Sequence, residues 1–405
     1  MRKMFMVLFL LLCTFSGLAR AQSDAPFSSL EEFQSALDTV LNAAEADRVE
    51  QLDALWNRLL ANQQVPMAFD DGTVVFLYRG EAETVEWRGD FNFWNEAPES
   101  FGEQQGDTDL WLMTDGFPPD ARLDYKIVLD GSVWLLDPYN PFQQMGGFGP
   151  NSELRMPEYE PSPYVDYRDD IEHGTLTGLQ TIASTNMGYA INYRVYRPSN
   201  YSELHDLPVI YATDGQEYAD DAMGSMVIVL DNMIADGLIE PVMAVFIDPR
   251  DPNDRSVNRR ESELITNPQY AAFIASELVP LIDVVYDTNP TPEARVMLGT
   301  SLGGLNAAYV GLHYSDVFGM LAINSPAFWV APSIFQEYED SERLPLNIFM
   351  TTGCPWDICE DARRMREIME LQGYPLRFIQ VHEGHSWGNW RALLDDMLLY
   401  FFAHA

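Results

Sequence analysis

The chain has 405 residues, which is enough material for two or three domains and a large hydrophobic core. It carries 62 acidic side chains against 24 basic ones, a formal net charge of −38 at neutral pH. Such a surface repels nucleic acid and anionic membranes, so neither is expected as a partner. The excess charge favours solubility in salty surroundings, where counterions screen the self-repulsion; attraction of a cationic ligand is the alternative.

The first 21 residues have the pattern of an export signal peptide. Arg2 and Lys3 form a positively charged start, an apolar run follows from Met4 to Cys13, and a small-x-small cleavage pattern ends at Ala21. The apolar run is short for a membrane span, and a retained N-terminal anchor is the alternative. We therefore expect a mature protein that is periplasmic or secreted, with no integral membrane association.

Residues 22–65 are predicted to be helical. A capping box begins at Ser28 or at Ser29, because a glutamate follows each of them three residues later. Apolar residues then recur at helical spacing on both sides of residues 43–47. One long helix and a helical hairpin broken in that stretch both fit the pattern, and the apolar stripe is expected to serve packing.

From residue 66 to residue 156 the apolar period changes to two, which is typical of strands. Short strand-like runs follow one another, and Asp130-Gly131 is a hairpin turn between two of them. Several short strands at this spacing predict a small β-sandwich. Residues 157–168 are rich in Pro and Tyr and are predicted to be a linker.

Residues 169–405 alternate strand-like and helical runs. This alternation predicts the α/β class, with a mostly parallel sheet and helices on both of its faces. The expected strands are 190–196, 208–212, 242–247, 295–298, 320–324, 346–350 and 376–381.

The most informative motif of the chain is Gly299-Thr300-Ser301-Leu302-Gly303. It lies between an expected strand and an expected helix, which is the setting of a nucleophile elbow. The tight turn of an elbow lifts the serine hydroxyl above the sheet, and glycines flank the serine because side chains there would collide. Together with the strand–helix alternation, the motif predicts an α/β-hydrolase with Ser301 as nucleophile.

A histidine is expected to activate this serine, because a serine hydroxyl is a weak nucleophile at neutral pH and needs a neighbouring base. His385 follows Gly384 in the loop between the last expected strand and the last expected helix. His382 lies at the end of that strand instead. We expect His385 to be the general base; the alternative is that either histidine is structural.

The third member of a triad is expected to be a carboxylate that holds the other nitrogen of the imidazole. Asp357 lies in the loop after the preceding strand, and Glu360 and Asp361 follow at the expected start of a helix, where acids suit the helix dipole. Asp357 is the preferred candidate, and Glu360 and Asp361 stay open. The resulting chain order Ser, Asp, His is that of the α/β-hydrolases.

Two cysteines lie beyond residue 21, Cys354 and Cys359. Their five-residue separation in an exported chain suits a local disulfide, which would hold Asp357 in its loop. A metal site is not expected, because no further cysteine and no nearby paired histidines complete a ligand set. The expected chemistry requires no cofactor.

Acyl transfer also needs hydrogen-bond donors for an oxyanion. The backbone amide of Leu302, directly after the nucleophile, is expected to be one donor. The second is expected from the loop after residues 209–212, where Gly215 or Gln216 offers a backbone amide and glycine allows close approach. A plain turn is the alternative there.

Five short segments together resemble one family. Asp214-Gly215-Gln216, the elbow and residues 260–264, 324–329 and 383–391 resemble the enterochelin esterase branch of an esterase superfamily. That superfamily also contains the feruloyl and acetyl-xylan esterases of carbohydrate esterase family 1 and the S-formylglutathione hydrolases. The resemblance covers roughly residues 170–402 and implies an α/β-hydrolase domain with serine esterase activity.

Residues 85–94, 125–127 and 137–141 resemble the early-set immunoglobulin-like, CBM48-like domain that precedes some carbohydrate-active enzymes and the enterochelin esterases. Its aromatic residues are expected in the sandwich core, and binding of sugar rings is the alternative. Two features depart from the cytoplasmic siderophore esterases. One is the export signal with the helical segment behind it, and the other is the acidic surface, which fits poorly with an anionic ferric catecholate.

The expected function is an exported serine carboxylic-ester hydrolase that acts through an acyl-enzyme on a small-molecule or oligosaccharide-linked ester. The alternatives are a feruloyl or acetyl-xylan esterase acting on plant or algal polysaccharide, an acyltransferase with the same triad, a peptidase, and a carbohydrate-binding protein with a vestigial site. Substrate contacts are expected from one arginine and three tryptophans, although an ion pair with Glu261 or Glu263, or packing in the core, would also account for them. These residues are Arg260, Trp329, Trp387 and Trp390.

Overall fold

The computed structural model describes residues 25–404, and the predicted export signal of residues 1–21 lies outside the described residues. The chain divides into two compact units between Gln64 and Val65. In the first unit, α1 (Leu30–Leu41) and α2 (Glu45–Ala61) contact each other as a hairpin and bury apolar side chains from both helices. The hydroxyl of Ser29 accepts a hydrogen bond from the backbone N–H of Glu32 and caps α1.

The second unit begins with two antiparallel sheets, which together are called the β-sandwich below. Their buried faces form one core that includes Phe76, Trp87 and Tyr125, so these aromatic side chains serve packing. The strand order is β1 (Met67–Ala68), β2 (Thr73–Arg79), β5 (Leu110–Gly116), β4 (Glu103–Gln104) in one sheet and β3 (Val85–Gly89), β6 (Arg122–Leu129), β9 (Gly149–Arg155), β8 (Gln143–Gly146) in the other, with β7 (Val133–Leu135) on β6.

The rest of the second unit, called the hydrolase region, is built on a nine-stranded sheet. Six strands from β14 to β18 run parallel, and the strands at the β12 edge are antiparallel, so the sheet is mostly parallel as predicted. The order is β10 (Thr175–Leu176), β12 (Ala190–Arg197), β14 (Met243–Asp248), β13 (Val209–Ala212), β15 (Arg295–Thr300), β16 (Met320–Asn324), β17 (Asn347–Gly353), β18 (Leu376–Val381), with β11 (Gln180–Ala183) on β12.

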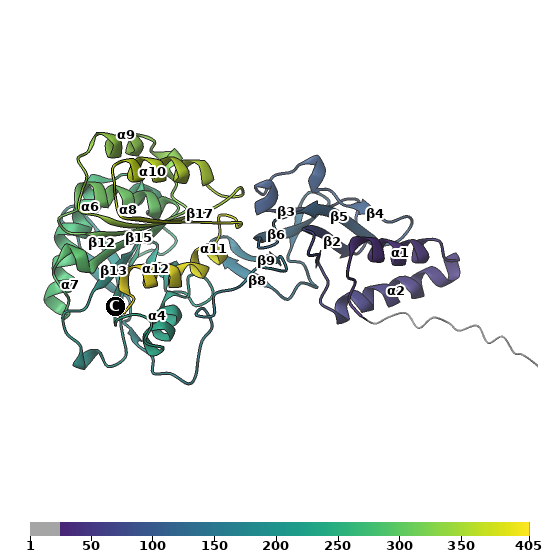
Figure 1. Ribbon diagram of the computed structural model, residues 1–405, viewed down its shortest axis with the longest axis horizontal. Coiled ribbons are helices and arrows are strands. Elements are labelled where there is room, and N and C mark those ends of the chain that lie inside the picture. Colours follow the sequence, from purple (N-terminus) through teal and green to yellow (C-terminus); the bar gives the residue numbers. More distant parts are fainter. Residues whose placement is uncertain (1–24, 405) are drawn as a thin grey trace, which may run out of the picture. The chain divides into compact units, whose positions relative to one another are not determined.

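Helices cover both faces of this sheet, as Figure 1 shows for α8 and α10 on one side and α4 and α12 on the other. A sheet buried on both faces needs apolar residues at successive positions, and every residue of β13, β15 and β16 is buried. The helices are α3 (Gly215–Tyr218), α4 (Met226–Ala235), α5 (Arg260–Leu264), α6 (Pro268–Phe273), α7 (Val279–Val285), α8 (Leu302–His313), α9 (Ser333–Asp340), α10 (Cys359–Leu371), α11 (Trp387–Ala392) and α12 (Leu394–Phe402).

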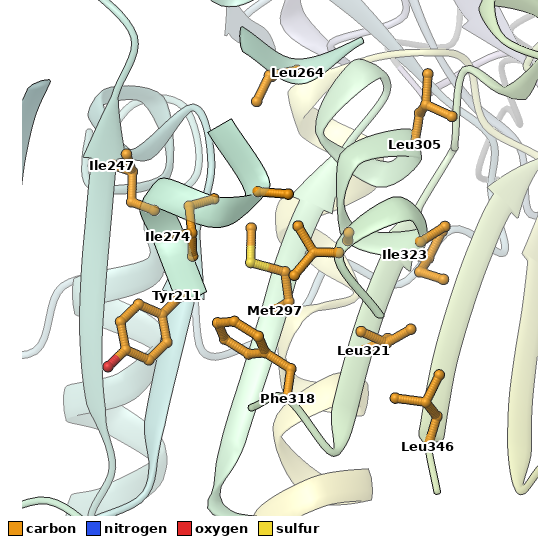
Figure 2. Close-up of a cluster of buried hydrophobic side chains, with 14 of the residues drawn as sticks. Tyr211, Ile247, Leu264, Ile274, Met297, Leu305, Phe318, Leu321, Ile323 and Leu346 are labelled. Carbon is orange, nitrogen blue, oxygen red and sulfur yellow. The ribbon is translucent and has the colours of Figure 1, made fainter. Parts of the chain in front are cut away.

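Two hydrophobic cores result, one on each face, because successive side chains of a strand point to opposite sides. In β13, Tyr211 joins the core beneath α6 to α10, whereas Ile210 joins the core beneath α4, α11 and α12. Figure 2 shows the first core, with Met297 of β15 between Ile274 and Leu321. These cores hold the strand ends, and therefore the loops that follow them, in fixed positions.

Residues 268–285 are the one stretch within residues 25–404 that is long and apolar enough to cross a membrane by length and composition. The stretch includes α6 and α7, and Tyr270, Phe273 and Leu278 are fully buried in the first core. Its apolar character is therefore accounted for by packing against the sheet.

Candidate active site

Ser301 lies in the tight turn between β15 and α8. Its backbone has φ 58° and ψ −117°, a conformation that costs energy for any residue except glycine and that marks functional turns. A Cβ atom at Gly299 would overlap the backbone of Gly303, so the close approach of strand and helix requires glycine there. The strand–turn–helix context predicted for the elbow is present.

His385 lies in the loop between β18 and α11 and is paired with Asp357. Its Nδ1 is 2.6 Å from Oδ1 of Asp357, and the ring packs edge-on against Trp390 at a centroid distance of 4.9 Å. The histidine side chain is 35% exposed, whereas the aspartate side chain is fully buried. Because Nδ1 faces the carboxylate, Nε2 is the nitrogen left to take a proton from a nucleophile.

Asp357 is held as a carboxylate by a complete set of donors. Burial raises its pKa, but the bonds from His385, from the hydroxyl of Ser325 and from the Gly353 amide more than offset this, so the net pKa lies below its ordinary value. The backbone N–H of Ile358 donates a further bond to Oδ1, at 2.7 Å. A carboxylate fixed in this way orients the imidazole and stabilises its protonated form.

The other two candidate acids lie elsewhere. Glu360 is on the first turn of α10, 87% exposed at its side chain, and pairs with Arg363 at 3.1 Å. Burial raises the pKa of Asp361, on the same turn, and the charge of Arg364 lowers it. The structure brings Asp357, and not Glu360 or Asp361, to the histidine. His382 pairs instead with Asp120 of the β-sandwich, at 2.7 Å.

The loop that holds Asp357, residues 353–359, is called the acid loop below. A disulfide between Cys354 and Cys359 closes it, and the Cα atoms of the two cysteines are 5.2 Å apart. The two residues directly before the cysteines, Gly353 and Ile358, donate the backbone hydrogen bonds to Asp357. The bridge thus encloses Asp357 and one of its backbone donors, Ile358, and the other donor, Gly353, lies directly before the ring. Within residues 25–404, no group of three or more His, Cys, Asp or Glu could hold a metal ion.

Ser301 and His385 line one cavity of about 720 Å³, a size suited to a small organic ligand. Both the hydrolase region and the β-sandwich contribute to it, and both belong to the second unit. From the β-sandwich come four aromatic side chains and Lys126, the one lysine beyond residue 3. The aromatic residues are Phe93, Trp94, Trp134 and Phe148.

The expected oxyanion donors are at the first turns of two helices. Leu302 is the first residue of α8, and Gly215 and Gln216 are the first two residues of α3. The first backbone N–H groups of a helix have no partner within the helix, so they can bind an anion. Gly215 also packs closely on β14, because a Cβ atom there would overlap the backbone of Phe246 and Ile247.

Arg260 lines the cavity and pairs with Asp214, not with Glu261 or Glu263. Its Nε is 2.8 Å from Oδ1 of that aspartate, which is buried. Burial raises the pKa of Asp214, and the guanidinium partly offsets this by stabilising the charged form. The ion pair holds the loop that carries Gly215 and Gln216 beside the elbow, since Arg260 also donates to the carbonyl of Thr300, at 3.4 Å.

The three tryptophans fall into two groups. Trp387 and Trp390 line the cavity but are largely buried. The indole N–H of Trp387 donates a hydrogen bond to Glu217 at 3.0 Å, and that of Trp390 donates one to Ser325 at 2.9 Å. Trp329 is 66% exposed and is not among the residues that line this cavity. The structure therefore places Trp387 and Trp390, and not Trp329, in the cavity that Ser301 and His385 line.

Sequence reasoning did not identify two parts of this site. Ser325, the hydroxyl donor to Asp357, follows β16, and no local pattern marks it. The aromatic residues of segments 85–94, 125–127 and 137–141 are expected in the sandwich core, yet Phe93 is exposed and lines the cavity. Trp134 and Phe148, which lie outside these segments, are exposed and line it as well.

A family model described as "Putative esterase" matches residues 184–401, which is more than half of the chain. The matched range includes the elbow, the acid loop and the loop that carries His385. It leaves out the helical hairpin and the β-sandwich.

Two curated proteins are similar to this chain, one over a longer stretch than the family model and one over a stretch of comparable length. The chain is 25% identical over 302 residues to an endo-1,4-beta-xylanase/feruloyl esterase of Xylanibacter ruminicola. The aligned stretch covers 71% of this chain and 39% of that protein. The chain is 26% identical over 213 residues to an iron(III) enterobactin esterase of Dickeya dadantii, which covers 47% of this chain and 46% of that protein. The matched part is thus less than half the length of either relative.

The crystal structure of a ferric enterobactin esterase from Salmonella typhimurium superimposes with a TM-score of 0.71 and 18% sequence identity. The superposition covers 83% of this chain and 95% of that one. This likeness confirms the predicted α/β-hydrolase fold.

Proposed function

The chain belongs to this esterase family and is a carboxylic ester hydrolase, and from that premise we propose that it acts as a serine esterase through an acyl-enzyme. Ser301 is the nucleophile, His385 the general base and Asp357 the acid that orients the histidine. The observation that carries the proposal is that a fully buried, charged Asp357 pairs with His385, which shares a cavity with a serine in a strained strand–helix turn.

In the first step, Nε2 of His385 takes the proton of the Ser301 hydroxyl while its oxygen attacks the ester carbonyl. The amides of Leu302 and of Gly215 or Gln216 bind the oxyanion that forms, and the imidazolium returns its proton to the departing alkoxide. A water molecule, deprotonated by the same histidine, then attacks the acyl-enzyme. The acid is released and the Ser301 hydroxyl is restored.

Hydrolysis of p-nitrophenyl acetate and butyrate tests this proposal. The mature chain is compared with Ser301→Ala in moderate and in high salt, because the acidic surface responds to ionic strength. Loss of the hydroxyl removes the covalent route, and we expect kcat to fall by about 10³-fold or more. Wild-type turnover at background level in every salt concentration would contradict the proposal.

The cavity supports an ester with an aromatic acyl group as substrate. Four aromatic side chains of the β-sandwich can stack on a ring, and Lys126 can pair with a phenolate or carboxylate on it. Feruloyl esters on polysaccharide and catecholate siderophore esters both carry such groups, as the names of the relatives suggest. The formal net charge of −38 favours the less anionic feruloyl ester.

A substrate panel separates these classes. Methyl ferulate, feruloylated xylo-oligosaccharide, acetylated xylan and a ferric catecholate ester are compared by kcat/KM, with product analysis in the presence of acceptor alcohols. A preference for the feruloyl esters supports the first class, and transfer to the alcohol in place of hydrolysis would identify an acyltransferase.

We further propose that the mature protein is exported and that residues 66–156 are an immunoglobulin-like module before a catalytic domain at 169–405. The two antiparallel sheets support the module, and the disulfide suits an oxidising compartment. Fractionation of cells that express the full chain, followed by N-terminal sequencing of the mature protein, tests the export and the cleavage after Ala21.

A further inference from the structure

Arg122 is a fully buried arginine that joins the β-sandwich to the histidine loop, which comprises residues 382–390. It is the first residue of β6, and its guanidinium bonds to Asp124, at 2.5 Å, and to Glu153, both in the β-sandwich. The same guanidinium donates to the hydroxyl of Ser386, at 3.0 Å, and lies 3.7 Å from the carboxylate of Glu383.

The hydroxyl of Ser386 accepts its hydrogen bond from this arginine and not from the helix that follows. A serine at the N-cap of a helix ordinarily accepts a hydrogen bond from a backbone N–H of the first turn. Ser386 is the N-cap residue of α11, yet its side chain makes no such bond. It accepts from Arg122 instead, and it is the residue directly after His385.

Backbone contacts strengthen the connection. The N–H of Arg122 donates to the carbonyl of His382, at 3.1 Å, and Arg122 and Glu383 form a parallel β-bridge. Side chains at Gly384 and Gly388 would overlap the carboxyl group of Asp90 and the guanidinium of Arg122. The histidine loop therefore contacts the β-sandwich at four positions, residues 382, 383, 384 and 388.

The acid loop is supported from the same side. The ring of Trp356, next to Asp357, packs edge-on against Phe117 of the β-sandwich at a centroid distance of 5.6 Å. Within the hydrolase region, Trp390 and Asn389 hold the histidine loop through Ser325 and the carbonyl of Gly384. On the side that faces the β-sandwich, the histidine loop contacts Arg122 through His382, Glu383 and Ser386.

We propose that Arg122 is a positioning residue for ester hydrolysis, whose guanidinium fixes the histidine loop through Ser386 and thereby sets His385 against Ser301. The inference rests on the proposed function and adds to it that the β-sandwich is part of the catalytic machinery. The planar guanidinium is needed because its nitrogens bond in three directions at once, to Glu153, Asp124 and Ser386. A misplacement of the base of about 1 Å lowers turnover by up to about 10²-fold.

The test compares Arg122→Met, Ser386→Ala and the double variant with p-nitrophenyl butyrate, at a temperature where thermal unfolding shows each protein to be folded. Arg79→Met is the matched control, because Arg79 pairs with Asp109 within the β-sandwich and does not line the cavity. We expect kcat to fall about 30- to 100-fold in Arg122→Met and about tenfold in Ser386→Ala, with KM within about threefold. The double variant should be no slower than Arg122→Met, since both changes remove one interaction.

A folded Arg122→Met with wild-type kcat, or a double variant in which the two losses multiply, would overturn the inference. If Arg122→Met does not fold, Ser386→Ala and Ser386→Thr decide, because threonine keeps the hydroxyl and should restore kcat. Wild-type turnover in Ser386→Ala overturns the inference. Ser301→Ala is measured alongside: an active wild type with an inactive Ser301→Ala supports the proposed function whatever Arg122→Met does, whereas an inactive wild type overturns both.

Discussion

Replacing Asp357 with asparagine removes one charge and alters almost nothing in shape. The carboxylate accepts four hydrogen bonds: Oδ1 from His385 and the Ile358 amide, Oδ2 from Ser325 and the Gly353 amide. An asparagine side chain has one oxygen, so its NH₂ group must face one of these two pairs of donors. Either orientation leaves a backbone N–H of the acid loop without an acceptor.

The magnitude follows from the two orientations. If the NH₂ group faces His385, the imidazole must accept at Nδ1 and carry its proton on Nε2, where it cannot act as a base. If it faces Gly353, the histidine keeps its tautomer but loses the negative charge that stabilises the imidazolium. We expect kcat to fall by about 10³- to 10⁴-fold, and the free energy of unfolding to fall by about 1–3 kcal/mol for the unsatisfied buried donor.

The assay is steady-state hydrolysis of p-nitrophenyl butyrate at pH 8, with urea unfolding of the same preparations. Glu360→Gln is the control, because it makes the same chemical change on an exposed acid three residues away. It should leave both kcat and stability near wild type. A kcat for Asp357→Asn within tenfold of wild type, or an equal loss in Glu360→Gln, would refute the assignment of the acid.

Two further predictions concern the acid loop and a buried glutamate. The double variant Cys354→Ser/Cys359→Ser should lose roughly 2 kcal/mol of stability, the loop-closure value for a six-residue ring. It should also lower kcat, because the ring contains Asp357 and the Ile358 amide that binds it and begins directly after Gly353, the other amide donor. Urea unfolding with unchanged stability would count against this. Burial raises the pKa of Glu263 from its ordinary 4.5 to about 8, against a hydrogen bond from Tyr189 that lowers it. Because the folded pKa is raised, the associated stability is present in full below pH 4.5 and is lost as the pH rises towards 8, by about 1.4 kcal/mol per pH unit. Glu263→Gln should flatten this part of the stability profile, and parallel profiles for the two proteins would disprove the role of Glu263.

The fold of the hydrolase region was predictable because its central strands are largely apolar and alternate with helical patterns. β13, β15 and β16 lie in the middle of a sheet covered on both faces, so nearly every residue had to be apolar. The elbow could be read from five residues, because Ser301 can adopt its strained backbone only where Gly299 and Gly303 leave room. Strand ends were less accurate, and β17 ends at Gly353, three residues after the expected end at residue 350.

The partners of the buried charges could not be predicted from local patterns. Arg260 pairs with Asp214, which is 46 residues away in the chain, and Arg122 reaches Ser386 across 264 residues. Propensity and periodicity describe neighbours within a turn or along a strand, so they carry no information on such distances. The choice of Asp357 over Glu360 also needed the structure, because only the end of β17 and the position of His385 together decide which carboxylate is within reach.

By itself, then, the sequence determined the class of fold and predicted Ser301 as nucleophile and His385 as base, because each depends on residue types at short spacing. The tertiary structure decided which acid meets His385, how Trp329 differs from Trp387 and Trp390, and that the β-sandwich lines the cavity beside Ser301. These depend on the packing of segments that are distant from one another in the chain. Buried charges must find partners there, because leaving one unpaired in the interior costs several kcal/mol.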